Sequence, residues 1–257
     1  MKNNFFFFFL LFLYYFKKIC YNYNGDIMIE KIKKILLFIG LFILFLYKDL
    51  IYMVPLAFLN IDLNSLSYQT STLLSIISSL FLILLILLIY KNYLKEKIVD
   101  YKKHFNNYFD MGFKVWFLGL LGMCVANVLI ATFSPIHEAN NEVLVQEMLK
   151  QAPLLSFISA TFIAPFLEEM LFRKCFGDIF KNKKLMIIGS GLVFGLLHVI
   201  FSLQTLWDLL YIIPYGFLGS AFAYSLYKSH DNVLVPMSFH ILHNGILTLI
   251  SILPMVI

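Results

Sequence analysis

The sequence is poor in cysteine and in charge, and each shortage excludes a class of protein. Its 257 residues include three cysteines, Cys20, Cys124 and Cys175, which lie far apart and form no CxxC pair. This spacing argues against a disulfide framework and against a cysteine-ligated zinc site. Charged residues make up only 14% of the chain and hydrophobic residues 61%, whereas soluble domains are about a quarter charged and about half apolar. The composition therefore predicts a membrane protein.

The hydrophobic residues gather in runs long enough to cross the roughly 30 Å of a bilayer's hydrocarbon core. They predict an all-α bundle of about seven transmembrane helices, near residues 35–59, 70–90, 115–133, 152–171, 185–203, 209–227 and 233–254. The first run contains Lys48, Asp49 and Pro55, so we expect a kink or a break in it.

The loops between the runs alternate in charge. Lysines precede the first run and follow the second, fourth and sixth, and the loop after the third run is acidic. Because basic loops stay in the cytoplasm, this pattern predicts a cytoplasmic N-terminus and an external C-terminus. Between the second and third runs, residues 91–114 mix lysine with tyrosine and phenylalanine, which fits either a helix in the cytoplasmic interface or a solvated linker.

Residues 1–27 open with five consecutive phenylalanines, Phe5 to Phe9, in an apolar run too short to span comfortably. No small-residue cleavage site follows this run. Met28 then begins a lysine-rich stretch that resembles a cytoplasmic start. We therefore expect translation to begin at Met28, with residues 1–27 as an untranslated extension.

Ionisable residues inside a bilayer are costly, about 2.5–3.5 kcal/mol each at a helix centre, and so mark functional candidates. The first cluster is Glu168, Glu169 and Arg173, which closes the fourth run. Glu169 and Arg173 stand four residues apart and share a helix face, so we expect them to pair. Glu168 is rotated by about 100° from its neighbour and is left free to take a proton. Arg173 is the only arginine in the chain, although all three charges could equally be ordinary helix-end residues.

Two further clusters lie in the fifth and seventh runs. His198 falls roughly 13 residues into the fifth run, which predicts a position near the middle of the membrane, and His240 lies within the seventh run with Asn244 one turn beyond it. A lone histidine on an apolar helix is more often structural, but two of them together with Asn244 and paired carboxylates favour a site. His243 lies only partly on the His240 face, and we expect a structural role for it.

Small and helix-breaking residues accompany the clusters. Gly191 and Gly195 stand four apart, with Gly189 nearby, so the fifth helix can approach a neighbour closely. Pro165 and Pro236 precede Glu168 and His240, and each is expected to free a backbone carbonyl near the site.

A carboxylate and two imidazoles in a membrane cavity suit the activation of water. Glu168 would be the general base, and His240 and Asn244 would donate to the oxyanion of a tetrahedral intermediate. Glu168, His198 and His240 are also a ligand set for catalytic zinc, and the residues alone do not decide between zinc and a metal-free mechanism.

The three motifs, EExxxR, FxxxH and HxxxN, occur in this order on separate hydrophobic segments and resemble the signature of the CPBP family. This family includes the CAAX prenyl proteases and bacteriocin-processing (Abi) proteins. The motif positions fall on Glu168, Glu169 and Arg173, then Phe194 and His198, then His240 and Asn244. The resemblance implies that Glu168 and His198 activate water, that His240 and Asn244 form the oxyanion site, and that Glu169 and Arg173 support them. It makes residues 151–257 the catalytic core and residues 28–150 accessory helices with an interfacial linker.

The resulting hypothesis is an intramembrane endopeptidase, opening toward the cytoplasm, in the plasma membrane of a bacterium. Its expected partners are the lipid bilayer and a peptide or membrane-protein substrate, with no nucleic acid; peptide maturation or bacteriocin self-immunity are the expected roles. Two alternatives stay open: a proton-coupled transporter that uses Glu168, His198 and His240 as a relay, and a non-catalytic immunity protein that binds peptides. The sequence carries no sign of the oligomeric state.

Overall fold

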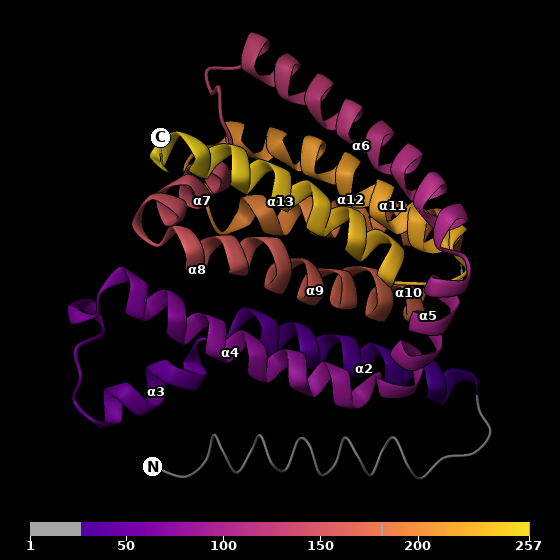
Figure 1. Cartoon of the computed structure of the whole chain (residues 1–257), viewed down its shortest axis with the longest axis horizontal. Coiled ribbons are helices and arrows are strands. Elements are labelled where there is room, and N and C mark those ends of the chain that lie inside the picture. The colour runs from indigo at the N-terminus through magenta and orange to yellow at the C-terminus, as the bar shows by residue number, and fades with distance from the viewer. Residues whose placement is uncertain (1–26, 181, 257) are drawn as a thin grey trace.

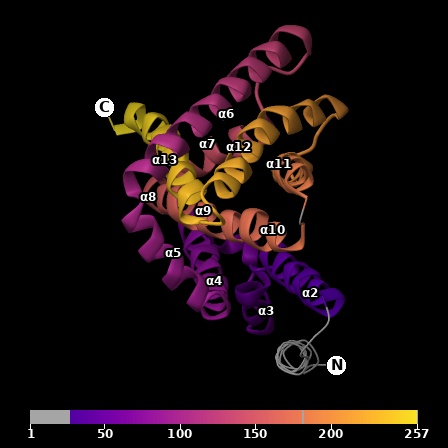
Figure 2. The same cartoon turned by 90° about the vertical axis from the view of Figure 1, so that its right-hand side faces the viewer.

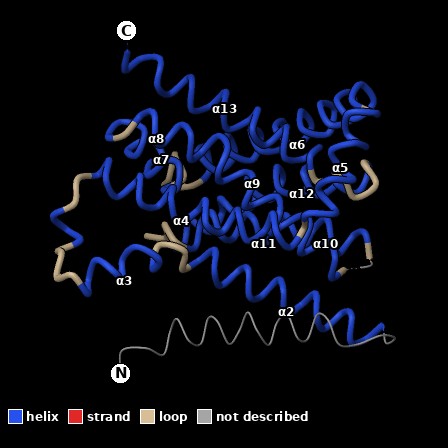
Figure 3. The backbone as a smooth tube through the Cα atoms, turned by 60° about the horizontal axis from the view of Figure 1, so that its bottom comes forward, coloured by secondary structure: helices blue, strands red, loops and turns tan. Residues whose placement is uncertain are grey.

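The computed structural model describes residues 27–180 and 182–256, and these residues form helices joined by short loops, without a strand (Figure 3). The expectation that translation begins at Met28 concerns residues 1–27, which lie almost wholly outside the described part. In chain order the helices are α2 (Ile27–Leu46), α3 (Leu50–Phe58), α4 (Tyr68–Ile89), α5 (Lys91–Lys103), α6 (Phe105–Phe133), α7 (Asn140–Gln151), α8 (Pro153–Ile158), α9 (Ala164–Glu168), α10 (Phe176–Ile179), α11 (Lys183–Ile200), α12 (Ile212–Lys228) and α13 (Leu234–Val256). Two 3₁₀ turns, η1 (Leu63–Ser65) and η4 (Leu206–Tyr211), and two π-helical segments, η2 (Ser159–Ile163) and η3 (Glu169–Cys175), complete the list.

Among the described residues, six helical segments are long and apolar enough to cross a membrane, and a bent pair makes a seventh. The bent pair is α2 and α3, which meet at 52° across residues 47–49. The kink predicted from Lys48 and Asp49 is thus present, and Lys48 Nζ contacts Asp49 Oδ1 at 3.0 Å there. The all-α, multi-pass prediction is confirmed.

Two helices are longer than the apolar runs indicated. α6 begins at Phe105 rather than near residue 115, and the fourth span continues from Pro153 to Ile179 through η2 and η3. In both cases polar residues extend a helix beyond its apolar core, because backbone hydrogen bonding carries on where side-chain hydropathy stops. The lysine-rich segment between the second and third spans is helical in α5, one of the two structures expected for it.

The helices run roughly parallel to one long direction, so the loops collect at two ends (Figure 1). α5 and α10 lie at one end, here called the basic end, and α7 and the C-terminal turns of α13 lie at the other, here called the α7 end. The α8–α10 span contacts α2 and α4 on one side and α13, α11 and α12 on the others, with α6 beyond (Figure 2). The fourth span is therefore the centre of the bundle.

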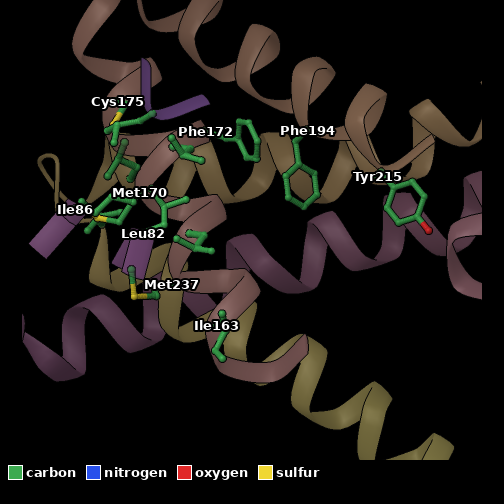
Figure 4. Close-up of a cluster of buried hydrophobic side chains, with 14 of the residues drawn as sticks. Leu82, Ile86, Ile163, Met170, Phe172, Cys175, Phe194, Tyr215 and Met237 are labelled. Atoms are coloured by element: carbon green, nitrogen blue, oxygen red, sulfur yellow. The ribbon is translucent and has the colours of Figure 1, made fainter. Parts of the chain in front are cut away.

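The core around the fourth span is apolar and aromatic (Figure 4). Met170, Phe172 and Cys175 of η3 are almost fully buried, as are Ile86 of α4 and Phe194 of α11. The face of α11 that carries Gly191 and Gly195 lies directly against the backbone of α12. A Cβ on Gly195 would be 2.6 Å from the carbonyl oxygen of Ile212, so the close approach predicted from the glycine spacing is present.

Candidate functional site

The fourth span separates its two adjacent carboxylates by a change of helix type. α9 ends at Glu168, and Glu169 begins η3, where the Phe176 amide bonds to Leu171, five residues back. Such π-helical segments are rare and occur frequently at functional sites. Every residue of η3 is buried, whereas the Glu168 side chain keeps 14% of its surface exposed. The neighbouring carboxylates therefore lie in different surroundings.

Glu169 lies in a sealed ionic cluster. Its Oε2 is 3.2 Å from Arg173 Nε, and both side chains are 0% exposed. The contact is ionic rather than an aligned hydrogen bond, because neither atom has a hydrogen-bond partner by geometry. Arg173 Nη1 donates to Ser190 Oγ at 2.9 Å, and its guanidinium lies 4.7 Å from the Phe194 ring centre. The pair predicted from the spacing of four is present, and the only arginine in the chain is wholly enclosed.

His240 lies between the two carboxylates. Its Nδ1 is 2.9 Å from Glu169 Oε1, and its Nε2 is 3.7 Å from Glu168 Oε2. A carboxylate can only accept, so this contact assigns the Nδ1 proton to the Glu169 bond. The ring also stacks on Phe222, with centres 4.8 Å apart. These contacts fix the imidazole with Nε2 toward Glu168, and a water at ordinary hydrogen-bond length, about 2.8 Å, can reach both atoms.

His198 presents one free ring nitrogen. Its Nδ1 lies 2.9 Å from the Phe194 carbonyl oxygen, so Nδ1 donates and Nε2 is available. Its ring stacks on Tyr215, with centres 4.7 Å apart. α11 ends at Ile200, so His198 lies in the last turn of its helix, near the α7 end.

Asn244 is held by a carbonyl that the fourth span cannot use. The Ala164 amide bonds to Ser159 in the π register of η2, and the next residue, Pro165, has no amide hydrogen to give to Ala160. Asn244 Nδ2 donates to that Ala160 carbonyl at 2.8 Å. Pro165 therefore frees a carbonyl at the site, as predicted. Pro236 does not loosen its helix, because it lies in the first turn of α13, where an amide hydrogen has no helical partner to lose.

A cavity of about 200 Å³ joins the polar residues that remain outside the sealed cluster. Glu168, His198, His240 and Asn244 all line it, and Glu169 and Arg173 do not. His243 lines it as well, beside the Trp116 ring at 6.4 Å. Of the six predicted site residues, four thus share a cavity and two lie behind it.

The cavity also contains residues that sequence reasoning missed. Asn141 and Glu142 of α7 and Tyr215 of α12 belong to its wall, and Asn141 Nδ2 donates to the Tyr215 hydroxyl at 3.4 Å. α7 is not a membrane span, and burial, together with the negative charge of Glu138, raises the pKa of Glu142 above its usual value. No motif connects α7 with the later helices, so only the folded chain brings these residues to the site.

The side chains that line the cavity include donors of the kinds that bind zinc. Glu168, His198 and His240 each have a donor atom of the correct type, and the Glu169 bond to His240 is of the kind that orients zinc-binding histidines. Among the described residues, however, no three side chains of His, Cys, Asp or Glu are grouped closely enough to hold a metal ion. Their present arrangement does not fit the ligand set, and the choice between zinc and a metal-free mechanism is not tested by it.

Comparisons with known proteins support the resemblance carried by the three motifs. Residues 150–246 match the family described as "Rce1-like: Type II CAAX prenyl endopeptidase Rce1-like". The chain is also 24% identical over 190 residues to a Bacillus subtilis (strain 168) protein named "Putative membrane peptidase YdiL", a match covering 70% of this chain and 72% of the relative. No solved structure matches the chain significantly. Both matches support a similarity to the CPBP family of intramembrane proteases.

Proposed function

We propose that this protein is an intramembrane endopeptidase that hydrolyses peptide bonds of membrane-associated peptides or proteins with water activated by Glu168. The observation that carries this proposal is the separation of two adjacent carboxylates. Glu169 is neutralised by Arg173 in a sealed cluster, while Glu168 lies in a cavity with two imidazoles and an amide. The family match and the peptidase relative support the same reaction class.

In the proposed reaction, Glu168 accepts a proton from a water held between its carboxylate and His198. The water oxygen attacks the peptide carbonyl carbon, and the carbonyl oxygen becomes an oxyanion. Glu168 then transfers this proton to the amide nitrogen, and the C–N bond breaks. The two peptide ends leave as a carboxylic acid and an amine.

The surrounding residues act through position and charge. His198 Nε2 holds the attacking water, because its Nδ1 is occupied by the Phe194 carbonyl. The second amide hydrogen of Asn244 is free for the oxyanion, since one hydrogen is spent on Ala160. His240 also donates to the oxyanion, from Nε2, when it is protonated. Donors fixed in advance stabilise such charge most, and each lowers the barrier by about 2.7–4 kcal/mol.

The test is peptide cleavage by purified protein in liposomes, with wild type compared with Glu168→Ala across a broad peptide panel. Glu147→Ala is the matched control, because Glu147 is an exposed carboxylate on α7 paired only with Lys150. The proposal predicts cleavage by wild type and by the control, and none by Glu168→Ala. Equal behaviour of wild type and Glu168→Ala would contradict it and favour a transporter or a peptide-binding immunity protein. Loss of cleavage with a strong chelator would assign a metal to the site.

A further inference from the structure

The cavity extends toward one end of the bundle only. Beyond the catalytic candidates its wall consists of Asn141 and Glu142 of α7, Tyr215 near the start of α12, and Thr248 and Ser251 in the later turns of α13. α7 and the end of α13 both lie at the α7 end (Figure 1). Any access to the site along this cavity therefore comes from the α7 end.

The opposite direction is closed by packed and ion-paired side chains. Glu169, Arg173 and the apolar residues of η3 fill the span just beyond Glu168, all of them buried. Lys174 then bonds to Asp178 and to Asp231, both at 2.8 Å, and so ties the fourth span to the turn between α12 and α13. This seal separates the cavity from the basic end.

The two ends also differ in basic residues. The basic end holds the lysines of α5, of the start of α11 and of the end of α12: Lys91, Lys95, Lys97, Lys102, Lys103, Lys183, Lys184 and Lys228. At the α7 end of the described chain the basic residues are Lys48, paired with Asp49, and Lys150, paired with Glu147. Lysine and arginine in short loops remain in the cytoplasm, so the basic end is the cytoplasmic one.

Together these observations reverse the expectation that the site opens toward the cytoplasm. We infer that the catalytic cavity opens to the outer face of the membrane, and that its substrates are peptide segments exposed on that face. The part of the inference that concerns substrates rests on the proposed function. The direction in which the cavity opens rests instead on its geometry and on the charge of the two ends. The cavity wall holds two carboxylates, Glu142 and Glu168, and no lysine or arginine; an outer segment with a strongly acidic sequence is therefore a poor occupant.

Single cysteines at the two ends test the inference without relying on cleavage. In a background with Cys20, Cys124 and Cys175 replaced by serine or alanine, Ser251→Cys places a thiol in the cavity wall, and Lys103→Cys places one on α5. Bacterial spheroplasts that express each variant are treated with a membrane-impermeant maleimide, before and after permeabilisation. Both variants are first shown to retain the wild-type melting temperature.

The inference predicts that Ser251→Cys reacts fully in intact spheroplasts and that Lys103→Cys gains most of its labelling, at least tenfold, only on permeabilisation. The reverse pattern, or a Ser251→Cys thiol that stays unlabelled in both conditions, would overturn it. Adding Glu168→Ala to the Ser251→Cys variant leaves the predicted labelling unchanged. The predicted labelling without peptide cleavage by the wild-type protein would therefore refute the proposed function and leave the direction of the cavity supported. Cleavage together with reversed labelling would support the proposed function and refute the direction.

Discussion

The two halves of the fourth span, which meet between Glu168 and Glu169, place the same kind of side chain in opposite surroundings. From Glu169 onward the span is π-helical, sealed and ion-paired, with the Glu169 and Arg173 side chains 0% exposed. Up to Glu168 it borders a cavity with Tyr215, His198 and Asn244 around it. One step along the chain thus separates a buried, ion-paired carboxylate from a carboxylate that borders a cavity.

This difference shows how a membrane protein can hold reactive charge. A buried ion pair adds little net stability, but a single member left without its partner is strongly destabilising. Glu169 is neutralised by Arg173 and at the same time orients His240 at 2.9 Å. The sealed half therefore positions a side chain of the cavity half, and the two halves can be broken separately.

The largest expected effect comes from removing the only arginine. Arg173→Met leaves Glu169 buried without a counter-ion, and we expect a loss of about 3–5 kcal/mol in the free energy of unfolding, measured by denaturant titration in mixed micelles. Lys184→Met, at an exposed position, is the control and should stay within about 0.5 kcal/mol. A cost for Arg173→Met no larger than that of the control would mean that the sealed half does not carry the charge pair.

The next largest effect distinguishes two histidines of the cavity wall: His198, which stacks on Tyr215, and His243, which lies beside Trp116. His198→Ala is expected to lower kcat about 10²–10³-fold by removing a group that holds the water, a loss larger than the loss of its stacking on Tyr215 explains. His243→Ala, which removes a ring beside Trp116, should lower stability more than kcat. Equal losses of kcat in the two variants would show that the sequence-based preference for His198 over His243 is unfounded.

A third prediction concerns the packing that supports the cavity. Gly195→Ala forces a methyl group into the Ile212 carbonyl, and overpacking of this kind costs about 1–3 kcal/mol. Gly177→Ala is the matched control, because the nearest atom to its new methyl would be 3.6 Å away, an ordinary contact. Thermal unfolding of both variants in detergent checks the pair, and an equal shift in melting temperature would refute the close approach of α11 and α12.

The smallest expected effect is that of Tyr215→Phe. The substitution removes the 3.4 Å hydrogen bond from Asn141 but keeps the ring that stacks on His198. Such a bond contributes about 0.5–1.5 kcal/mol, so we expect less than about a tenfold change in kcat/KM for a peptide substrate. A loss as large as that of His198→Ala would instead give the Tyr215 hydroxyl a direct part in the chemistry.

Much of this arrangement follows from local patterns in the sequence. Apolar runs indicate the spans, Lys48 and Asp49 indicate the break between α2 and α3, and the spacing of Glu169 and Arg173 indicates their contact. Each of these signals acts within one helix or at one boundary. The free carbonyl of Ala160 is also local, because it results from Pro165 five residues later.

Other features depend on contacts that no local pattern contains. The His240 bond to Glu169 joins residues 71 positions apart, and α7 reaches the cavity only because the chain folds back against α12 and α13. His198 lies closer to the end of its helix than the apolar run indicated, because hydropathy continues past Ile200, where the helix ends. The outward direction inferred for the cavity differs from the expected one for a related reason: charge in loops reports the orientation of the helices, and only the packing between them shows which end is sealed.

The separation of Glu168 from Glu169 is tested most directly by making the same conservative change at both positions. Glu168→Gln and Glu169→Gln are prepared in the same liposomes, and peptide cleavage and thermal unfolding are measured on each. We predict that Glu168→Gln loses at least about 10²-fold in kcat with its melting temperature kept, and that Glu169→Gln, which leaves Arg173 uncompensated, unfolds at a clearly lower temperature. The opposite assignment, or two variants with the same loss of activity and the same stability, would contradict the division between the sealed and the reactive carboxylate.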